Sequence, residues 1–301
     1  MSALSDNLFV VTLLAYVFAG LGYAAEYLLA SRSDLGRSDS PEAVQPSKIW
    51  AERWGRVALG IAVVGALAHA ATLVTRGLAA HRVPWGNMYE FVLVVCLVAV
   101  LTWLVLVLRW PAARQFGFLV TVTLAMMLLL TGVRLYTAVA PLVPALNSYW
   151  LKIHVTSISV ASGIFMIGFL SAVLTLLRYG YERGRTGFPF ALTARLPEAA
   201  RLERITARLH TVAFPIFTFA VICGAIWAEA AWGRYWGWDP KETWAFISWV
   251  VYAGYLHARA TPSVKRTMAT WIAVAGWLTV MFNLYGVNLV FHGLHSYAGV
   301  K

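Results

Sequence analysis

Long apolar stretches recur along this chain, and they constrain its fold more than any other feature. Hydrophobic residues make up 60% of the 301 residues and charged residues only 12%, whereas a soluble globular domain carries about 25% charged residues. A membrane core about 30 Å thick needs about 20 apolar residues per helix. The sequence therefore predicts an all-α fold, a polytopic integral membrane helix bundle that forms a single membrane domain over residues 1–301. We expect about eight transmembrane helices, at residues 7–30, 57–77, 88–108, 115–135, 151–177, 210–231, 243–258 and 268–290.

The basic residues are spread unevenly over the connections between these spans. Seventeen of the 24 Lys and Arg lie in residues 31–56, 109–114, 178–209 and 259–267. Because inner loops of membrane proteins carry an excess of Lys and Arg, these connections are predicted to be inner and both termini outer. The net charge of +11 then reflects topology and contact with anionic lipids of the bilayer, and we expect no nucleic-acid partner.

The largest of these inner connections is the basic segment 178–209. Its second part, residues 197–210, has Leu202, Ile205 and Leu209 on one helical stripe. This pattern suits a helix that lies on the inner membrane surface. A solvated linker is the alternative, and the sequence leaves both open.

The connection between the sixth and seventh spans, residues 227–244, is unusually rich in tryptophan. Trp and Tyr favour the headgroup level of a membrane, so an aromatic belt is one explanation. Here, however, the indoles gather in one connection and alternate with Gly233 and Gly237, which would let a ligand approach the backbone. This favours a shelf on which a planar apolar ligand stacks. The five tryptophans are Trp227, Trp232, Trp236, Trp238 and Trp244.

Two segments carry the signature of a helix start. Asp239-Pro240-Lys241-Glu242 places Asp at the N-cap, Pro at the first helical position and Glu at the third, as in a capping box. Asn87 and Glu90 have the same spacing at the third span. A functional interpretation is compatible with the first cap. A helix N-terminus flanked by Lys241 and Arg234 would also attract the carboxylates of a flat anionic ligand.

Three of the histidines are predicted to share one depth with the tryptophan connection. His154 begins the fifth span, and His292 and His295 follow the eighth. Two facing imidazoles are what a haem iron takes as axial ligands, although an interfacial histidine can also be a simple hydrogen-bonding group. The sequence therefore indicates a candidate haem site at the outer membrane surface.

His257 lies about 21 Å below the outer end of the seventh span, at 1.5 Å per residue. Ionisable groups at such a depth are functional candidates. His69 is nearer the outer face and matches His257 poorly in depth, while His210 matches it better. If His257 binds a metal, its partner is either His210 or a residue of another chain.

The run Trp232-Gly-x-x-Trp236-Gly-Trp238-Asp239-Pro-Lys-Glu-Thr-Trp244 resembles the tryptophan-rich WWD signature of haem-handling proteins. Further segments are similar to the CcsA/ResC type, the integral-membrane half of the system II cytochrome c synthase. They are Pro84-x-x-Asn87-x-Tyr89-Glu90, the His154 segment, Tyr255-Leu-His257-x-Arg259 and Gly293-Leu-His295-Ser-Tyr297.

This resemblance implies a function and a set of site residues. His154 and His295 would be the outer axial ligands of haem b on the WWD shelf, and His257 a membrane-embedded ligand of haem in transit. The activity implied is cytochrome c synthase (haem lyase) at the outer face of a bacterial cytoplasmic membrane. Partners implied are a ResB-like membrane subunit, apocytochrome c with its Cys-x-x-Cys-His segment, and thiol-reducing proteins outside. Alternatives are a membrane haem-b electron-transfer protein and a haem exporter.

Overall fold

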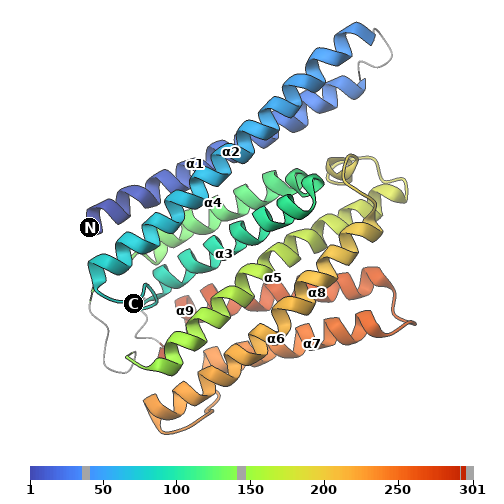
Figure 1. Ribbon diagram of the computed structural model, residues 1–301. Coiled ribbons are helices and arrows are strands. Elements are labelled where there is room, and N and C mark those ends of the chain that lie inside the picture. Colours follow the sequence, from blue (N-terminus) through green and yellow to red (C-terminus); the bar gives the residue numbers. More distant parts are fainter. Residues whose placement is uncertain (36–40, 141–146, 292, 296–301) are drawn as a thin grey trace.

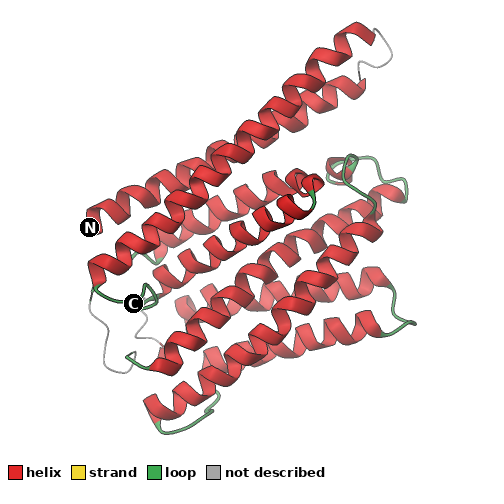
Figure 2. Cartoon of the chain, in the orientation of Figure 1, coloured by secondary structure: helices red, strands yellow, loops and turns green. Residues whose placement is uncertain are grey.

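The computed structural model describes residues 1–35, 41–140, 147–291 and 293–295, and their regular structure is helical throughout (Figures 1 and 2). The predicted all-α fold is confirmed. The eight long helices are α1 (Ser2–Leu35), α2 (Pro41–Ala80), α3 (Met88–Arg109), α4 (Gly117–Arg134), α5 (Tyr149–Glu182), α6 (Ala199–Trp232), α7 (Pro240–Ala260) and α8 (Arg266–Met281). Short elements are the 3₁₀ helices η2 (Pro111–Phe116) and η4 (Phe190–Thr193), the π-helical turn η5 (Phe282–Gly286) and α9 (Val287–Val290).

Seven helical segments within the described ranges are long and apolar enough to cross a membrane. They comprise α1 to α6 and the run from α8 through α9. The remaining long helix, α7, is less apolar, but its 21 residues give a length of about 31 Å at 1.5 Å per residue. That length matches a membrane core, and α7 lies alongside α8 and α6. The chain is therefore a multi-pass membrane protein, in which α7 is long enough to be an eighth span.

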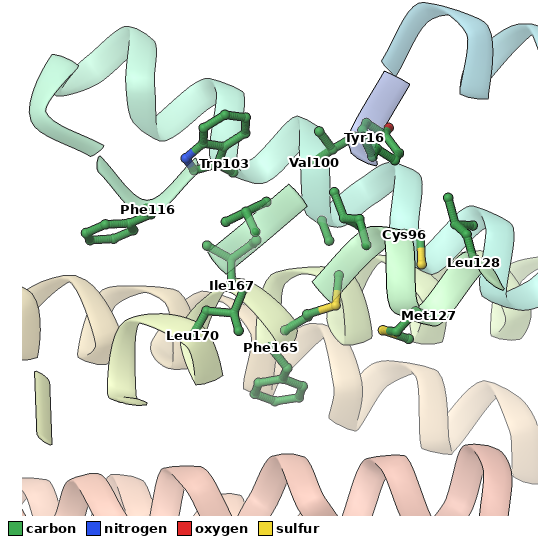
Figure 3. Close-up of a cluster of buried hydrophobic side chains, with 14 of the residues drawn as sticks. Tyr16, Cys96, Val100, Trp103, Phe116, Met127, Leu128, Phe165, Ile167 and Leu170 are labelled. Atoms are coloured by element: carbon green, nitrogen blue, oxygen red, sulfur yellow. The ribbon is translucent and has the colours of Figure 1, made fainter. Parts of the chain in front are cut away.

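Most helices pack on the helix that follows them in the chain, and several also pack on a more distant one (Figure 1). Helix α1 packs along α2 and α4, α3 packs on α4 and α5, and α5 also packs on α6 and α8. Figure 3 shows the buried side chains of the core, including Cys96, Trp103 and Phe165. Close approach of α3 and α5 depends on Gly163, because a Cβ there would lie 2.6 Å from Val98. The core is thus continuous across the middle of the bundle.

Both ends of the described chain lie at one end of the bundle. Near the N-terminus, Asp6 accepts a hydrogen bond of 3.2 Å from Tyr136, just after α4. At the other terminus His295 packs on Trp232, the last residue of α6. We call this the site end. The opposite end, where α1, α3, α5 and α7 finish, we call the basic end.

The segment 197–210 differs from both predicted alternatives. Residues from Ala199 onward form the first turns of α6, continuous with the membrane span. Leu202 is fully buried, and the Thr206 hydroxyl donates to the Ser171 hydroxyl of α5 at 2.9 Å. The apolar stripe therefore faces the neighbouring helix α5. It is neither a separate surface helix nor a solvated linker.

Candidate functional site: a tryptophan-lined cavity with two anchored imidazoles

Helix α7 begins at the predicted cap. The Asp239 carboxylate accepts the Lys241 N–H at 3.0 Å, and the Glu242 carboxylate accepts the Asp239 N–H at 3.1 Å. These bonds complete a capping box, which satisfies backbone donors that a helix start leaves unpaired. Glu242 also accepts the Gly237 N–H at 2.8 Å. The tryptophan connection is thereby fixed to the start of α7.

Asp239 also holds the C-terminal segment in place. Its Oδ1 lies 2.9 Å from His295 Nδ1, and its Oδ2 accepts the Leu294 N–H at 2.7 Å. Burial by itself raises the pKa of Asp239, but the His295 hydrogen bond and charge and the N–H donors of Leu294 and Lys241 outweigh it and lower the pKa to about 2. The carboxylate is therefore ionised at neutral pH, so the proton in this pair lies on His295 Nδ1.

His154 lies in the second turn of α5, where it faces α6. Its Nδ1 lies 2.7 Å from the Ala220 carbonyl oxygen. Because a carbonyl only accepts hydrogen bonds, Nδ1 must carry the proton, and Nε2 of the neutral ring has a lone pair. Gly224 gives this ring its space, since a Cβ there would lie 2.7 Å from the imidazole. The ring of Trp227 is nearly parallel to it, at 6.5 Å and 13°.

Trp227 connects the two imidazoles. Its ring centroid lies 5.9 Å from that of His295, and Trp232 lies 5.0 Å from the same histidine. The start of α5 and the segment after α9 are thus brought to one indole of α6. Both histidines line one cavity at the site end. The predicted juxtaposition of His154 and His295 with the tryptophan connection is what the structure shows for Trp227, Trp232 and Trp236.

Aromatic and apolar side chains from α3, α5, α6 and the tryptophan connection form most of this cavity's wall. Among its polar groups, Lys241 has no carboxylate within ion-pair distance in the described part of the chain, and its Nζ lies 3.9 Å from Met88 Sδ. A cation left without a partner in apolar surroundings is stabilised by a bound anion. Lining residues used below are Trp85, Met88, Phe91, His154, Trp227, Trp232, Trp236, Lys241 and His295.

Four of the residues predicted to bind a cofactor at the outer face do not line the cavity: Arg234, Trp238, Asp239 and Trp244. Trp238 is 65% exposed and packs edge-on against Trp236. Trp244 packs on Phe282 of the π-helical turn, at 4.1 Å between ring centroids. Arg234 pairs with Glu242 at 3.5 Å. Their positions support the connection and the start of α7 from outside.

The glycines of the tryptophan connection have local roles that the sequence did not indicate. Gly233 ends α6 with a φ of 70°, a left-handed conformation in which glycine is favoured. Gly237 lies against the guanidinium of Arg234 and donates its N–H to Glu242. Neither glycine lines the cavity. The expectation that they let a flat ligand approach the backbone stays a prediction, which the lining of this cavity does not support.

The other histidines lie apart from the cavity. His257 is exposed in the last turn of α7, at the basic end. His210 is buried among Phe165, Tyr252 and Tyr255, so the two imidazoles face different surroundings. His69 is buried beside Tyr16 of α1, with 3.3 Å between the Tyr16 hydroxyl and His69 Nδ1.

A permanent haem between paired membrane histidines is not favoured by this arrangement. Helix α2, which carries His69, packs on α1 and α3, whereas α7 packs on α6 and α8. His292 lies outside the described residues.

The start of α3 contributes part of the site that composition alone did not reveal. Trp85, Met88 and Phe91 line the cavity opposite the tryptophan connection. The sequence signals here are the Asn87–Glu90 cap, which fixes where α3 begins, and the family resemblance of the segment from Pro84 to Glu90. Gly224 gave no signal at all, because it is one small residue inside an apolar span.

The model of the family described as "Cytochrome C assembly protein" matches residues 85–295 of the chain. The cytochrome c biogenesis protein CcsA of Parasynechococcus marenigrum is 34% identical over 281 residues, which cover 84% of this chain and 90% of that protein. CcsA of Chlamydomonas reinhardtii is 40% identical over 160 residues, 52% of this chain and 43% of that protein, so the match spans less than half of this relative's length.

Among solved structures, the cytochrome c haem lyase CcmF superposes with a TM-score of 0.56 and 15% identity, over 97% of this chain and 48% of the CcmF chain. At that identity the likeness concerns the fold alone. The family match, by contrast, covers most of the chain and every cavity-lining residue named above. The chain belongs to the cytochrome c assembly protein family.

Proposed function

We propose that this membrane subunit of cytochrome c maturation binds haem b as its substrate in the tryptophan-lined cavity, with His154 and His295 as axial ligands. One observation carries the proposal. Two imidazoles from distant segments line the same cavity, and the Nδ1 of each is held by an acceptor of the protein. In metal-binding histidines the ring nitrogen that does not bind the metal characteristically donates its N–H to a carboxylate or a carbonyl. Asp239 and the Ala220 carbonyl supply one acceptor of each kind, which leaves Nε2 as the ligand nitrogen.

The remaining wall suits the rest of the haem molecule. The indoles of Trp227, Trp232 and Trp236 offer apolar faces and edges to a planar ring. Lys241 offers a positive charge to a propionate, and it lacks a carboxylate partner among the described residues. Trp238, Trp244 and Arg234 then act indirectly, by fixing the connection in position.

The reaction that we infer is covalent attachment of haem to the Cys-x-x-Cys-His segment of apocytochrome c. Each thiol adds across a haem vinyl group: its S–H bond and the π bond of the vinyl group break, a C–S bond and a C–H bond form, and no net oxidation occurs. Cys96 and Cys223 are separately buried, so both thiols come from the substrate, kept reduced by external thiol-reducing proteins. The protein's contribution is then orientation and proximity of haem and peptide, and the vinyl chemistry belongs to the haem.

A ResB-like partner and an outer location of the cavity complete the proposal. The basic end carries most of the Lys and Arg, and the positive-inside rule supports a cytoplasmic location for it. Both termini and the cavity would then lie at the outer face of a bacterial cytoplasmic membrane. His257, exposed on α7, would become a ligand of haem in transit when the partner supplies a second ligand.

Histidine substitutions in a reconstituted system test this proposal. The chain is co-expressed with a ResB-like partner and a reporter apocytochrome, and covalent haem on the reporter is measured. We expect His154→Ala and His295→Ala each to abolish attachment and to reduce the b-type haem absorbance of the purified complex. The control is His81→Asn, because His81 is exposed with a φ of 51°, a conformation that Asn tolerates. Full attachment in both cavity variants would refute the ligand assignment.

A further inference from the structure

A second hollow lies at the basic end, away from the haem cavity. Helices α3 and α6 both pack on α5, which forms the floor between them (Figure 1). The groove that results has a volume of about 730 Å³. Along its length the wall is apolar, with Leu101 and Val105 of α3 facing Val212 of α6 across Ile164 of α5.

Arginines gather where the groove reaches the basic end. Arg109 ends α3, and Arg201, Arg204 and Arg208 lie on the exposed stripe of α6. Over the described ranges none of the four has a carboxylate within ion-pair distance. Three other arginines at this end are paired with carboxylates: Arg114–Glu26 at 2.7 Å, Arg259–Glu203 at 2.9 Å and Arg178–Glu182 at 3.1 Å. The groove therefore holds four guanidinium groups that no carboxylate of the described chain compensates.

Trp110 indicates the depth of this arginine cluster. It lies directly after α3 and lines the groove, and the Arg201 guanidinium stacks over its ring at 4.6 Å. Tryptophan favours the headgroup level of a membrane. From Arg201 to Arg208 the stripe rises by about 10 Å along α6. The cations thus span the headgroup region, and the apolar part of the groove lies at the depth of the acyl chains.

We propose that this groove is a binding site for an anionic phospholipid. The phosphate would contact Arg201, Arg204 and Arg208, and an acyl chain would lie along Leu101 and Val105 over α5. Charge complementarity selects an anionic headgroup, as in other basic pockets between transmembrane helices. The apolar length of the groove favours a lipid over a small soluble anion, which would leave that surface uncovered. This site is independent of haem binding at the opposite end.

Lipid-dependent stability tests the proposal. The purified full chain is transferred to detergent micelles that contain phosphatidylglycerol or phosphatidylcholine, and Tm is measured as each lipid is titrated. Glycerol 3-phosphate serves as the soluble headgroup. We expect phosphatidylglycerol to raise Tm and the other two to have little effect. An equal rise with phosphatidylcholine or with glycerol 3-phosphate would overturn the assignment.

Charge-matched variants distinguish a site from general surface charge. Arg204→Gln/Arg208→Gln removes two groove cations, and we expect phosphatidylglycerol binding to weaken about 30-fold, roughly fivefold for each cation near the surface. Arg53→Gln/Arg56→Gln removes the same charge from exposed positions of α2 and should keep the wild-type response. Equal weakening in both variants would show a non-specific effect.

A third variant fills the groove without changing its charge. Leu101 is 47% exposed, so Leu101→Trp should leave Tm in phosphatidylcholine unchanged and reduce the phosphatidylglycerol response. If a helix of a partner subunit occupies the groove instead, the chain alone will show no lipid preference. The same variants will then reduce co-purification of that partner, and the lipid proposal is overturned.

Discussion

Helices α3 and α7 begin with the same capping signature, but only the cap residue of α7 also binds a distant segment of the chain. At α3 the Asn87 amide oxygen accepts the Glu90 N–H at 2.9 Å, and the Asn87 side chain makes no hydrogen bond to another segment of the described chain. At α7 the Asp239 carboxylate caps the helix and also binds His295 and Leu294. An amide offers one acceptor oxygen and a carboxylate offers two. The second oxygen, together with the charge, allows one cap to hold an imidazole as well.

The glutamates of the two caps differ in the opposite sense. Glu90 is fully buried and binds Arg76 at 2.8 Å and Arg82 at 2.7 Å. Glu242 meets Arg234 at 3.5 Å, and that arginine is one third exposed. At α3 the strongest charge interactions are therefore those of the glutamate, and they stabilise the fold. At α7 the strongest charge interaction is that of the cap residue Asp239, and it positions His295 in the cavity.

The largest effect that this comparison predicts is at Glu90. Glu90→Gln leaves the buried Arg76 guanidinium without its counter-charge, and losing one partner of a buried pair costs about 3–5 kcal/mol. We expect the free energy of unfolding, measured in mixed detergent micelles, to fall by that amount. Glu242→Gln is the matched change and should cost about 1 kcal/mol or less, since exposed pairs contribute little. Equal losses would mean that the two glutamates do not differ.

Asp239→Asn tests the other half of the comparison. Asn is as good an N-cap as Asp, so stability should change by less than about 1 kcal/mol. The bond to His295 loses its charge, and changes of this kind behind metal-binding histidines cost about 10- to 100-fold in affinity or activity. Covalent haem on a reporter apocytochrome should fall by that factor. Asn87→Ser is the matched change at α3: it keeps a cap there, and although Asn87 lines the cavity it holds neither imidazole, so attachment should fall by less than about twofold.

The smallest predicted effect concerns the glycine beside each cap. A Cβ on Gly293 would lie 2.4 Å from Asp239 Oδ2, whereas one on Gly86 would meet only the flexible guanidinium of Arg82 at 2.6 Å. Gly293→Ala should therefore displace the segment that carries His295 and reduce attachment roughly tenfold, since small misplacements of a reacting group are costly. Gly86→Ala should change attachment by less than about twofold. A larger loss for Gly86→Ala would reverse the interpretation.

What the sequence predicted well was local or strongly periodic. Seven of the predicted spans follow from apolar length, and both caps follow from residue types three positions apart, so no tertiary information was needed for them. The nearness of His154, His295 and the tryptophans was also predictable, because spans that cross a bilayer bring alternate connections to one face. Topology thus located the site before packing was known.

Side-chain direction could not be predicted in the same way. Which indoles face the cavity depends on where α6 ends, and Gly233 sets that end after Trp232. Trp238 and Trp244 consequently face elsewhere, although their spacing in the sequence looks equivalent. The hydrogen bond from His154 of α5 to the Ala220 carbonyl of α6 depends on the space over Gly224, where the two helices meet. Such contacts leave no periodic trace in a single sequence.

His154 lies in a long helix and His295 in a short segment after α9, and this difference has a consequence for ligand exchange at the site. His154 belongs to a 34-residue helix, so its ring cannot withdraw far without unwinding part of the bundle. His295 belongs to a segment beyond the last helix, anchored to the start of α7 through Asp239. A competing imidazole from a substrate would therefore displace the tail more readily than the helix. Under the proposed function, the substrate imidazole would replace His295 first. His154, fixed by α5, would remain in place until attachment is complete.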